Sequence, residues 1–309
     1  MKGNKNAKKR KKAKSAGRMN ALLIGMCILL MLVAGFYIIN YYRLMNDTEK
    51  DNRMLSDMYF NSNESADNTS TPEEISKVES EQDDLETATK IEPVIITYPR
   101  PPEEIAPEFI EARSINSDVV GFLHIPAKTV DDIELFVVQR DNEYYLTHDF
   151  FGEKKKSGAL FLDQANEIWP QDQHLIIYGH NMKNGTMFAR LPRYKSIEYA
   201  YNNPFVYFDT LYEKGAYVVL AAVRLPAKEM LTEGFNLRTF TFGEASLKSF
   251  LFDVSQNALY MTKVGADEND QLLSLVTCAY NEEDERFLLI TRRIREGETE
   301  EMLKKMIRE

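Results

Sequence analysis

Three side chains suited to nucleophilic catalysis stand at the ends of apolar segments: Cys278, His180 and Arg286. Cys278 closes the segment 274–278, and the chain's only other cysteine, Cys27, lies in an apolar stretch near the N-terminus. An exported protein usually pairs its thiols, so a lone thiol outside that stretch favours a reactive role. The alternative is that Cys278 is a small buried hydrophobe.

His180 ends the apolar segment 175–180, where Gly179 would let the backbone turn and Asn181 begins a polar loop. This placement predicts an imidazole exposed at the rim of a sheet. Because an imidazole titrates near neutral pH, it can act as both acid and base. A histidine is more often structural, but its strand-end flanks set His180 apart from the other three.

Arg286 follows the acidic segment 281–285 and opens the next apolar segment. If segments 272–277 and 286–290 pair across this loop, Cys278 and Arg286 face each other at one end of the sheet. A neighbouring cation lowers the pKa of a thiol and favours the nucleophilic thiolate. The alternative is a solvated ion pair with Glu282, Glu283 or Glu285, which stabilises little.

The region after residue 103 is predicted to be mainly β. Short apolar segments separated by polar loops favour a closed or nearly closed sheet over alternating β-α units. Helical spacing of apolar residues predicts a helix within 105–117 and another within 243–257, before the cysteine strand. The predicted strands are 119–125, 133–138, 159–162, 174–178, 205–208, 216–223, 272–277 and 287–294.

The N-terminus predicts a single membrane-spanning segment. Nine cationic side chains within residues 1–18 precede residues 19–42, which carry no charge. That length is sufficient to cross a hydrocarbon core of about 30 Å. Aromatic residues follow in place of a cleavage site, and the basic cluster predicts a cytoplasmic N-terminus and an extracellular remainder. This interpretation is favoured over nucleic-acid binding by the basic tail.

The domain organisation follows from these changes in composition. Residues 1–18 form a basic cytoplasmic tail, and residues 19–42 a signal anchor that contacts the lipid bilayer. Residues 43–103 form an acidic, solvated stalk whose first part, 44–59, continues as a helix. Residues 104–309 form one extracellular domain, large enough to bury a core. The net charge of the chain is −10.

The catalytic residues lie in motifs that resemble those of the sortases. Segment 274–278 resembles the Thr-Leu-x-Thr-Cys signature of that family, and Arg286 and segment 178–181 resemble its arginine and histidine positions. Further segments resemble class B sortases, so that the likeness extends over residues 104–294. These segments are 118–123, 137–139, 142–146, 158–163 and 179–188.

This resemblance implies an eight-stranded sortase-type β-barrel and a membrane-anchored cysteine transpeptidase of a Gram-positive bacterium. Cys278 would attack the carbonyl of a Thr in the C-terminal sorting signal of a secreted protein, and an amine acceptor would resolve the thioacyl enzyme. His180 would act as acid and base, and Arg286 would donate to the oxyanion. No cofactor or metal is implied, and the acidic loop 281–285 is interpreted as a solvated hairpin.

Substrate contacts are expected at Val276, Thr277 and Asn181. The resemblance implies a pentapeptide signal with Pro at its second or third position, bound beside Cys278 and by the connection 224–257. Val276 replaces a hydroxyl that several class B enzymes have, which shifts the expected recognition sequence. Segment 132–136 departs from the class pattern Ile-Asp-Tyr-Pro, and the sequence offers no reason for it.

Several functions remain open on the sequence alone. The acceptor amine could belong to a peptidoglycan cross-bridge, which attaches surface proteins to the wall, or to a pilin, which polymerises. An extracellular cysteine peptidase would release the thioacyl intermediate to water instead. An anchored binding module without enzymatic activity would merely bury Cys278.

Overall fold

The computed structural model describes residues 3–67, 100–127, 132–226, 231–232, 235–237, 246–278 and 285–308. The chain divides into two units, residues 1–51 and residues 52–309, which are considered separately. The predicted acidic loop lies largely outside the described residues, at 279–284.

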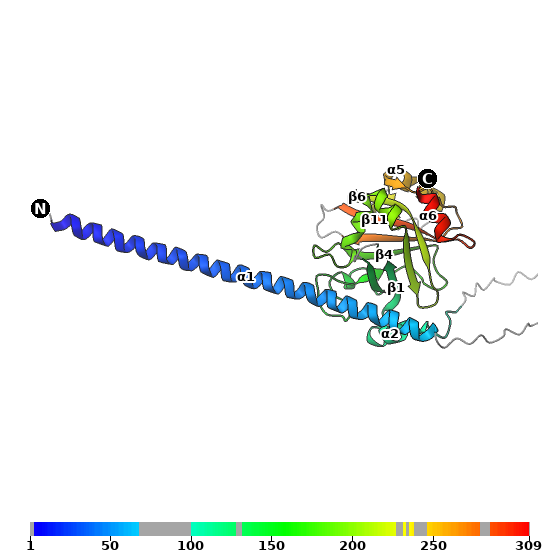
Figure 1. Ribbon diagram of the computed structural model, residues 1–309, viewed down its shortest axis with the longest axis horizontal. Coiled ribbons are helices and arrows are strands. Elements are labelled where there is room, and N and C mark those ends of the chain that lie inside the picture. The colour runs from blue at the N-terminus through cyan, green and yellow to red at the C-terminus, as the bar shows by residue number, and fades with distance from the viewer. Residues whose placement is uncertain are drawn as a thin grey trace, which may run out of the picture. The chain divides into compact units, whose positions relative to one another are not determined.

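The second unit contains the predicted barrel, and all eight predicted strands are confirmed (Figure 1). Two further strands, β7 (Leu231–Thr232) and β8 (Phe235–Asn236), form a separate small sheet. A ninth strand of the main sheet, β9 (Ala258–Met261), was not predicted. The eight predicted strands are β1 (Val119–Ile125), β2 (Ile133–Val138), β3 (Leu160–Leu162), β4 (His174–His180), β5 (Phe205–Thr210), β6 (Ala216–Pro226), β10 (Leu272–Cys278) and β11 (Glu285–Arg293).

The main sheet closes on itself through β6 and β11. Its strand order is β11-β10-β4-β3-β2-β1-β5-β6-β9, and β6 also pairs with β11 along the opposite edge of β6. The long β6 strand therefore pairs with β5 near its start and with β9 further along the same edge. Closure removes the free edges that an open sheet of this size would expose.

Helices cover the outside of the barrel, so most strands are buried on both faces. This explains why they read as continuous apolar runs instead of alternating patterns. Helix α5 (Leu247–Asn257) buries Leu247, Phe250 and Val254 against one side. Its N-terminus is capped by Ser246, whose Oγ accepts a hydrogen bond from the main-chain N of Ser249 at 3.2 Å.

The remaining helices are short. The predicted helix within 105–117 is confirmed as the 3-10 helix η1 (Pro107–Phe109) followed by α2 (Ile110–Ile115). The C-terminal helix α6 (Glu300–Arg308) was not predicted; its Leu303 and Ile307 are buried beside β5 and β6. Other helices that were not predicted are η2 (Tyr144–Leu146), η3 (Phe188–Lys195) and α3 (Ile197–Asn202).

Helix α1 (Gly3–Asp67) extends through both units. From Ile24 onward it contains a helical stretch long and apolar enough to cross a membrane, a property that a signal sequence shares. Large apolar side chains of this stretch are exposed, from Ile24 to Tyr42.

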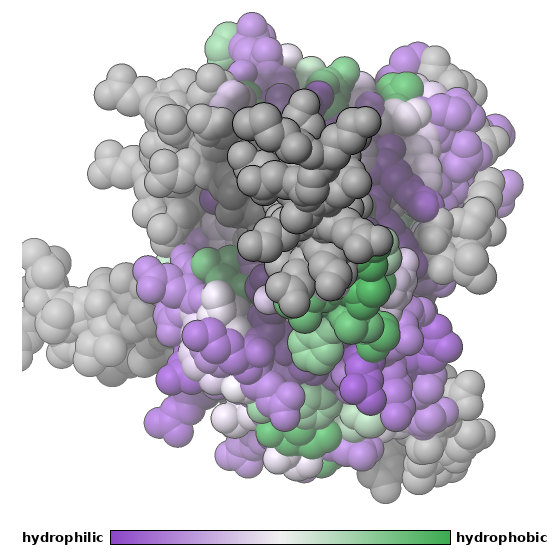
Figure 2. All heavy atoms as spheres, turned by 90° about the vertical axis from the view of Figure 1, so that its left-hand side faces the viewer, coloured by the Kyte–Doolittle hydropathy of each residue, from purple (hydrophilic) through white to green (hydrophobic). Residues whose placement is uncertain are grey.

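Figure 2 shows a largely hydrophilic face on which hydrophobic residues gather in a few green areas.

The last part of α1 packs against the barrel, in contrast to the solvated stalk expected from its acidic composition. Leu55 and Tyr59 are buried, and the Tyr59 ring stacks on Phe122 of β1 at 3.9 Å. The Tyr59 hydroxyl donates to Oδ2 of Asp209 at 2.6 Å. The helix predicted for 44–59 is thus confirmed and continues to Asp67. Apolar residues one helical turn apart were sufficient to bury this face.

His174 generates a prediction about acid stability. It is fully buried, its Nε2 lies 2.8 Å from Oγ of Ser274, and burial lowers its pKa from 6.5 to about 3. In the unfolded chain His174 takes up a proton as the pH falls below about 6.5, whereas in the folded chain it stays neutral until the pH is much lower. The free energy of unfolding is therefore highest above pH 6.5 and decreases as the pH falls. Acidification from pH 7.5 to 4.5 should lower the free energy of unfolding by about 2 to 3 kcal/mol through this group.

Chemical denaturation at the two pH values tests this expectation. The wild-type domain should lose more stability on acidification than His174→Gln, which cannot titrate at this position. Equal losses in both proteins would contradict it.

Candidate active site

The pairing of β4 with β10 brings the predicted nucleophile next to the predicted acid and base. The two strands run parallel, and the register aligns Leu272 with His174 and, six positions later, Cys278 with His180. Both residues end their strands, so they lie at the same end of the barrel. The backbone of Cys278 is described, while its thiol lies outside the described part of the structure.

Arg286 lies on the other side of the cysteine strand. β10 and β11 are antiparallel, and their register includes Val276 opposite Leu288. Continuing that register by two positions puts Arg286 opposite Cys278. His180, Cys278 and Arg286 thus occupy neighbouring positions on β4, β10 and β11, and directly paired residues share one face of a sheet.

The ion-pair alternative for Arg286 loses one of its three proposed partners. Glu285 pairs with Arg224 of β6. Arg286 itself is half-buried, and its Cα pairs with that of Leu225. Glu282 and Glu283 lie outside the described residues. Burial lowers the pKa of Lys195, and the nearby guanidinium of Arg224 lowers it further. Cations therefore gather near this end of β6.

The imidazole of His180 is buried, with 8% of its surface exposed, and not open at a rim as predicted. Its Nε2 lies 2.7 Å from the main-chain oxygen of Leu146. Because a carbonyl only accepts, Nε2 carries the hydrogen, and Nδ1 is the basic nitrogen of the neutral ring. Burial lowers the pKa of His180 below 6.5, and the hydrogen bond to Leu146 opposes that shift only in part.

The loop that carries Leu146 is held by contacts of its own. The Tyr145 hydroxyl donates to Oδ2 of Asp118 at 2.8 Å, and Lys155 forms a largely buried ion pair with Asp149 at 2.8 Å. Gly158 has φ +58°, and a Cβ there would lie 2.3 Å from the Tyr145 oxygen. No role was predicted for the Leu146 carbonyl, because a main-chain group carries no side-chain signal.

Gly179 serves close packing and not the predicted turn. It lies inside β4, where a Cβ would come within 2.3 Å of Leu160 Cδ2 and 2.7 Å of Phe188 Cδ2. The glycine therefore lets two core side chains lie directly beside the position of His180.

The three residues expected to contact substrate lie in different environments. Val276 is fully buried in the apolar cluster that includes Phe250 of α5, so its position gives no support to direct contact with a peptide. Thr277 is also buried, and its Oγ1 accepts from the main-chain N of Phe287 at 2.9 Å. Asn181 is exposed immediately after His180.

A metal ion has one candidate position among the described residues, and it is separate from these strand ends. His124, Asp132 and Glu134 bring a nitrogen and two carboxylate oxygens together on β1 and at the start of β2.

Comparisons with known proteins agree with this arrangement. A family model described as Sortase domain matches residues 123–294. Sortase B of Listeria monocytogenes is 30% identical over 181 residues, covering 57% of this chain and 68% of that protein. Sortase B of Staphylococcus aureus is 26% identical over 196 residues, covering 62% of this chain and 77% of that protein.

Solved structures are similar as well. A Staphylococcus aureus sortase B–substrate complex aligns with a TM-score of 0.55 and 26% identity, covering 63% of this chain and 88% of that one. A Bacillus anthracis protein described as similar to sortase B aligns with a TM-score of 0.59 and covers 81% of this chain and 96% of that one. At 24% identity, the second likeness shows the fold alone.

Thr277 yields a prediction about the strand pair that carries Cys278 and Arg286. Thr277→Val keeps the shape but leaves the Phe287 N–H buried without its acceptor, so it should lower stability by about 1 to 3 kcal/mol. Hydrogen exchange at the Phe287 amide should accelerate. Thr277→Ser keeps the hydroxyl and should preserve protection of that amide. Equal protection in the Val and Ser variants would show that the hydroxyl does not hold these strands together.

Proposed function

Because the chain belongs to the sortase family, in its class B, and is a cysteine transpeptidase, we propose that it joins secreted proteins to an amine of the bacterial cell wall. The observation that carries the proposal is the alignment of Cys278 with His180 in adjacent strand ends. The substrate would be a protein with a C-terminal sorting signal, in keeping with the substrate complex named for the Staphylococcus aureus relative.

The proposed reaction proceeds in two acyl transfers. The Cys278 thiolate attacks the carbonyl carbon of the signal's Thr, and the tetrahedral intermediate collapses to a thioester as the peptide amine leaves. His180, which takes up the Cys278 thiol proton at Nδ1 when the thiolate forms, gives this proton to the departing amine. The acceptor amine, proposed to belong to a peptidoglycan cross-bridge, then loses a proton to His180 as it attacks the thioester, which releases the thiolate.

Arg286 is proposed to stabilise the oxyanion in both tetrahedral intermediates. A guanidinium offers directional donors where negative charge develops, and its position opposite Cys278 suits that role. Lys195 near the same end of the barrel adds a positive charge, while the charge of Arg224 is offset by its ion pair with Glu285. Such a positive charge also favours the thiolate form of a neighbouring cysteine.

The first test is the nucleophile. Cys278→Ala should abolish cleavage of a sorting-signal peptide while the barrel keeps its fold, because no other described group is placed to form the thioester. Cys27→Ala is the matched control and should keep full activity. Measurable turnover by a folded Cys278→Ala protein would overturn the enzymatic assignment of Cys278.

The same assay separates the transpeptidase from a peptidase. An added amine, such as a short glycine peptide, should divert product from the hydrolysed to the amine-linked form. Product that stays hydrolysed at every amine concentration would point to an extracellular peptidase instead. A lysine-containing pilin segment as acceptor tests the polymerising alternative.

A further prediction of the proposed reaction concerns Arg286. Arg286→Lys keeps the charge but loses the planar fork of donors, so it should lower kcat/KM by about 100- to 1,000-fold, as loss of an oxyanion donor does. Arg286→Ala should be at least as damaging. If both variants retain wild-type kcat/KM, Arg286 is only an ion-pair residue.

Another prediction concerns the location of the protein in the cell. We propose that residues 19–42 are an uncleaved anchor in the cell membrane, with residues 1–18 in the cytoplasm and the catalytic domain outside, because the basic cluster precedes the apolar segment. A membrane-impermeant thiol reagent should label wild-type protein on intact, wall-stripped cells through Cys278. Cys278→Ala should remain unlabelled. Labelling of the wild type only after permeabilisation would reverse the orientation.

A further inference from the structure

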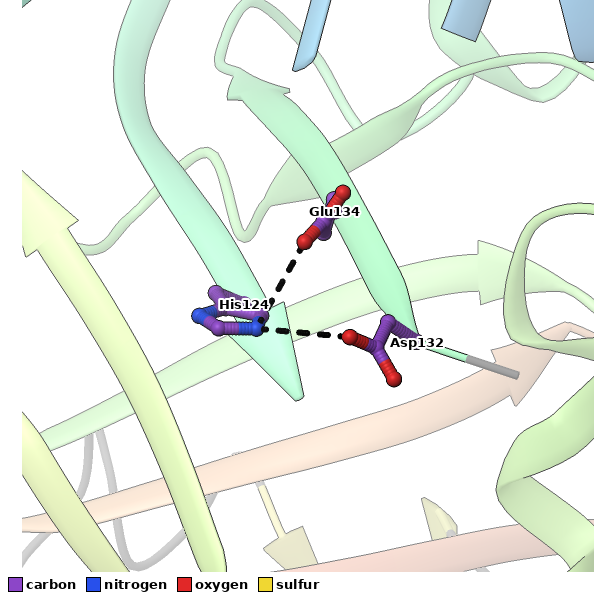
Figure 3. A group of neighbouring side chains, drawn as sticks. All are labelled: His124, Asp132 and Glu134. Carbon is purple, nitrogen blue, oxygen red and sulfur yellow. Dashed lines mark ion pairs between the residues drawn. The ribbon is translucent and has the colours of Figure 1, made fainter. Parts of the chain in front are cut away.

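A group of three side chains on β1 and at the start of β2 is not used by the proposed reaction. His124 on β1 pairs directly with Glu134 on β2, and Asp132 lies two residues before Glu134. Figure 3 shows the three side chains turned toward one another from these neighbouring segments. Residues two apart along an extended chain share a face, so the register itself gathers these groups.

The spacing of the group suits a shared central ion better than direct hydrogen bonds. His124 Nε2 lies 3.6 Å from Glu134 Oε1 and 4.0 Å from Asp132 Oδ2. Both distances exceed the roughly 2.7 to 3.2 Å of a hydrogen bond. Tetrahedral ligands bound to one zinc ion at about 2.0 to 2.2 Å lie about 3.3 to 3.6 Å apart, so the separation of 3.6 Å to Glu134 fits and the separation of 4.0 Å to Asp132 is slightly longer.

His124 Nε2 is also a buried polar atom for which no hydrogen-bond partner is present. The His124 ring is positioned by two aromatic neighbours, the edge of Phe60 at 5.8 Å and the ring of Tyr207 at 5.8 Å. These contacts hold the ring so that Nε2 points at the two carboxylates, as Figure 3 shows.

Each carboxylate has one oxygen held by a donor from outside the group and the other turned toward His124. Glu134 Oε2 accepts from the Ser56 hydroxyl at 2.7 Å, which leaves Oε1 facing the imidazole. Asp132 Oδ1 accepts from the main-chain N of Ala127 at 2.8 Å, which leaves Oδ2 facing it. Outer hydrogen bonds that orient ligating atoms in this way are characteristic of metal sites.

The charges favour a cation at the centre. Two carboxylates directed at one point repel each other, and a divalent ion would neutralise both. We propose that His124, Asp132 and Glu134 bind a zinc ion, with water as the fourth ligand at the exposed Asp132 side.

Zinc fits this donor set better than calcium or magnesium. A neutral imidazole nitrogen with two carboxylates is a common zinc environment, whereas calcium and magnesium prefer oxygen ligands alone. Ser56 and Phe60 belong to the part of α1 that packs on the barrel, while the ligands lie on β1, on β2 and directly before β2. A bound zinc would therefore fasten this part of α1 to the barrel through Glu134.

Zinc titration by calorimetry tests the proposal, with the chelator-treated full chain in detergent micelles. All proteins carry Cys278→Ala, so that the thiol beside His180 binds no metal. One saturable zinc site is expected. His124→Gln and Glu134→Gln should weaken it at least 10-fold, and Ser56→Ala should weaken it by about 10-fold through loss of the outer hydrogen bond.

His148→Gln and Glu111→Gln are the matched controls, since they remove the same chemical groups elsewhere in the domain, and both should bind zinc as the parent does. Calcium at the same concentration should not compete. Absence of a saturable site in the parent, or equal zinc affinity in His124→Gln, Glu134→Gln and the controls, would overturn the proposal.

Folding of each variant is checked by circular dichroism and by its zinc-free melting temperature. If His124→Gln does not fold, Asp132→Asn and Glu134→Gln carry the test. Zinc should raise the melting temperature of the parent but not of these variants, because a ligand that binds the folded state stabilises it. An equal rise in the variants would contradict the assignment.

Discussion

The parallel register between β4 and β10 is the constraint on which the site depends. The two strands are distant in sequence, and the strand order of the sheet makes them neighbours so that Cys278 aligns with His180. A slip of one residue would turn every side chain of a strand to the other face. Contacts that fix this register therefore support the site without touching it.

Two contacts fix the cysteine strand, one to each of its neighbours. His174 and Ser274 link β4 to β10 at 2.8 Å near the start of both strands. Thr277 links β10 to β11 through the main-chain N of Phe287 at 2.9 Å, one residue before the cysteine. Both are buried polar groups, and such groups are costly to leave without partners, so each favours one register over its neighbours.

The sequence was sufficient to predict eight strands of the main sheet, and the three residues that it singled out occupy neighbouring positions at the strand ends. Apolar runs such as 175–177 are long because helices cover the outside of the barrel, and the acidic loop before Arg286 indicated a hairpin. The four-residue strand β9 was missed because its short apolar segment directly follows α5, and a short apolar run cannot be told from a continuation of the helix by its pattern alone. The hydrogen bond from His180 to Leu146 could not be predicted from the sequence, because every residue has a main-chain carbonyl and none marks it as an acceptor.

The group at His124 shows a different limit. Asp132 and Glu134 belong to a segment whose sequence was unexplained, and only the pairing of β1 with β2 brings them to a histidine. The last part of α1 likewise has the composition of a solvated stalk, yet Leu55 and Tyr59 are buried on the barrel. In both cases a few residues at the right spacing outweigh the average character of the segment.

The hydrogen bond between His180 and Leu146 also bears on the order of events in catalysis. With Nε2 committed to a carbonyl, the proton exchanged in each acyl transfer has to pass through the other nitrogen, Nδ1. The departing and incoming amines would then use the same atom in turn and could not occupy it together. Under the proposed reaction, such a site would operate by a ping-pong sequence, in which the first product leaves before the second substrate enters, and the thioester would have to persist through that interval.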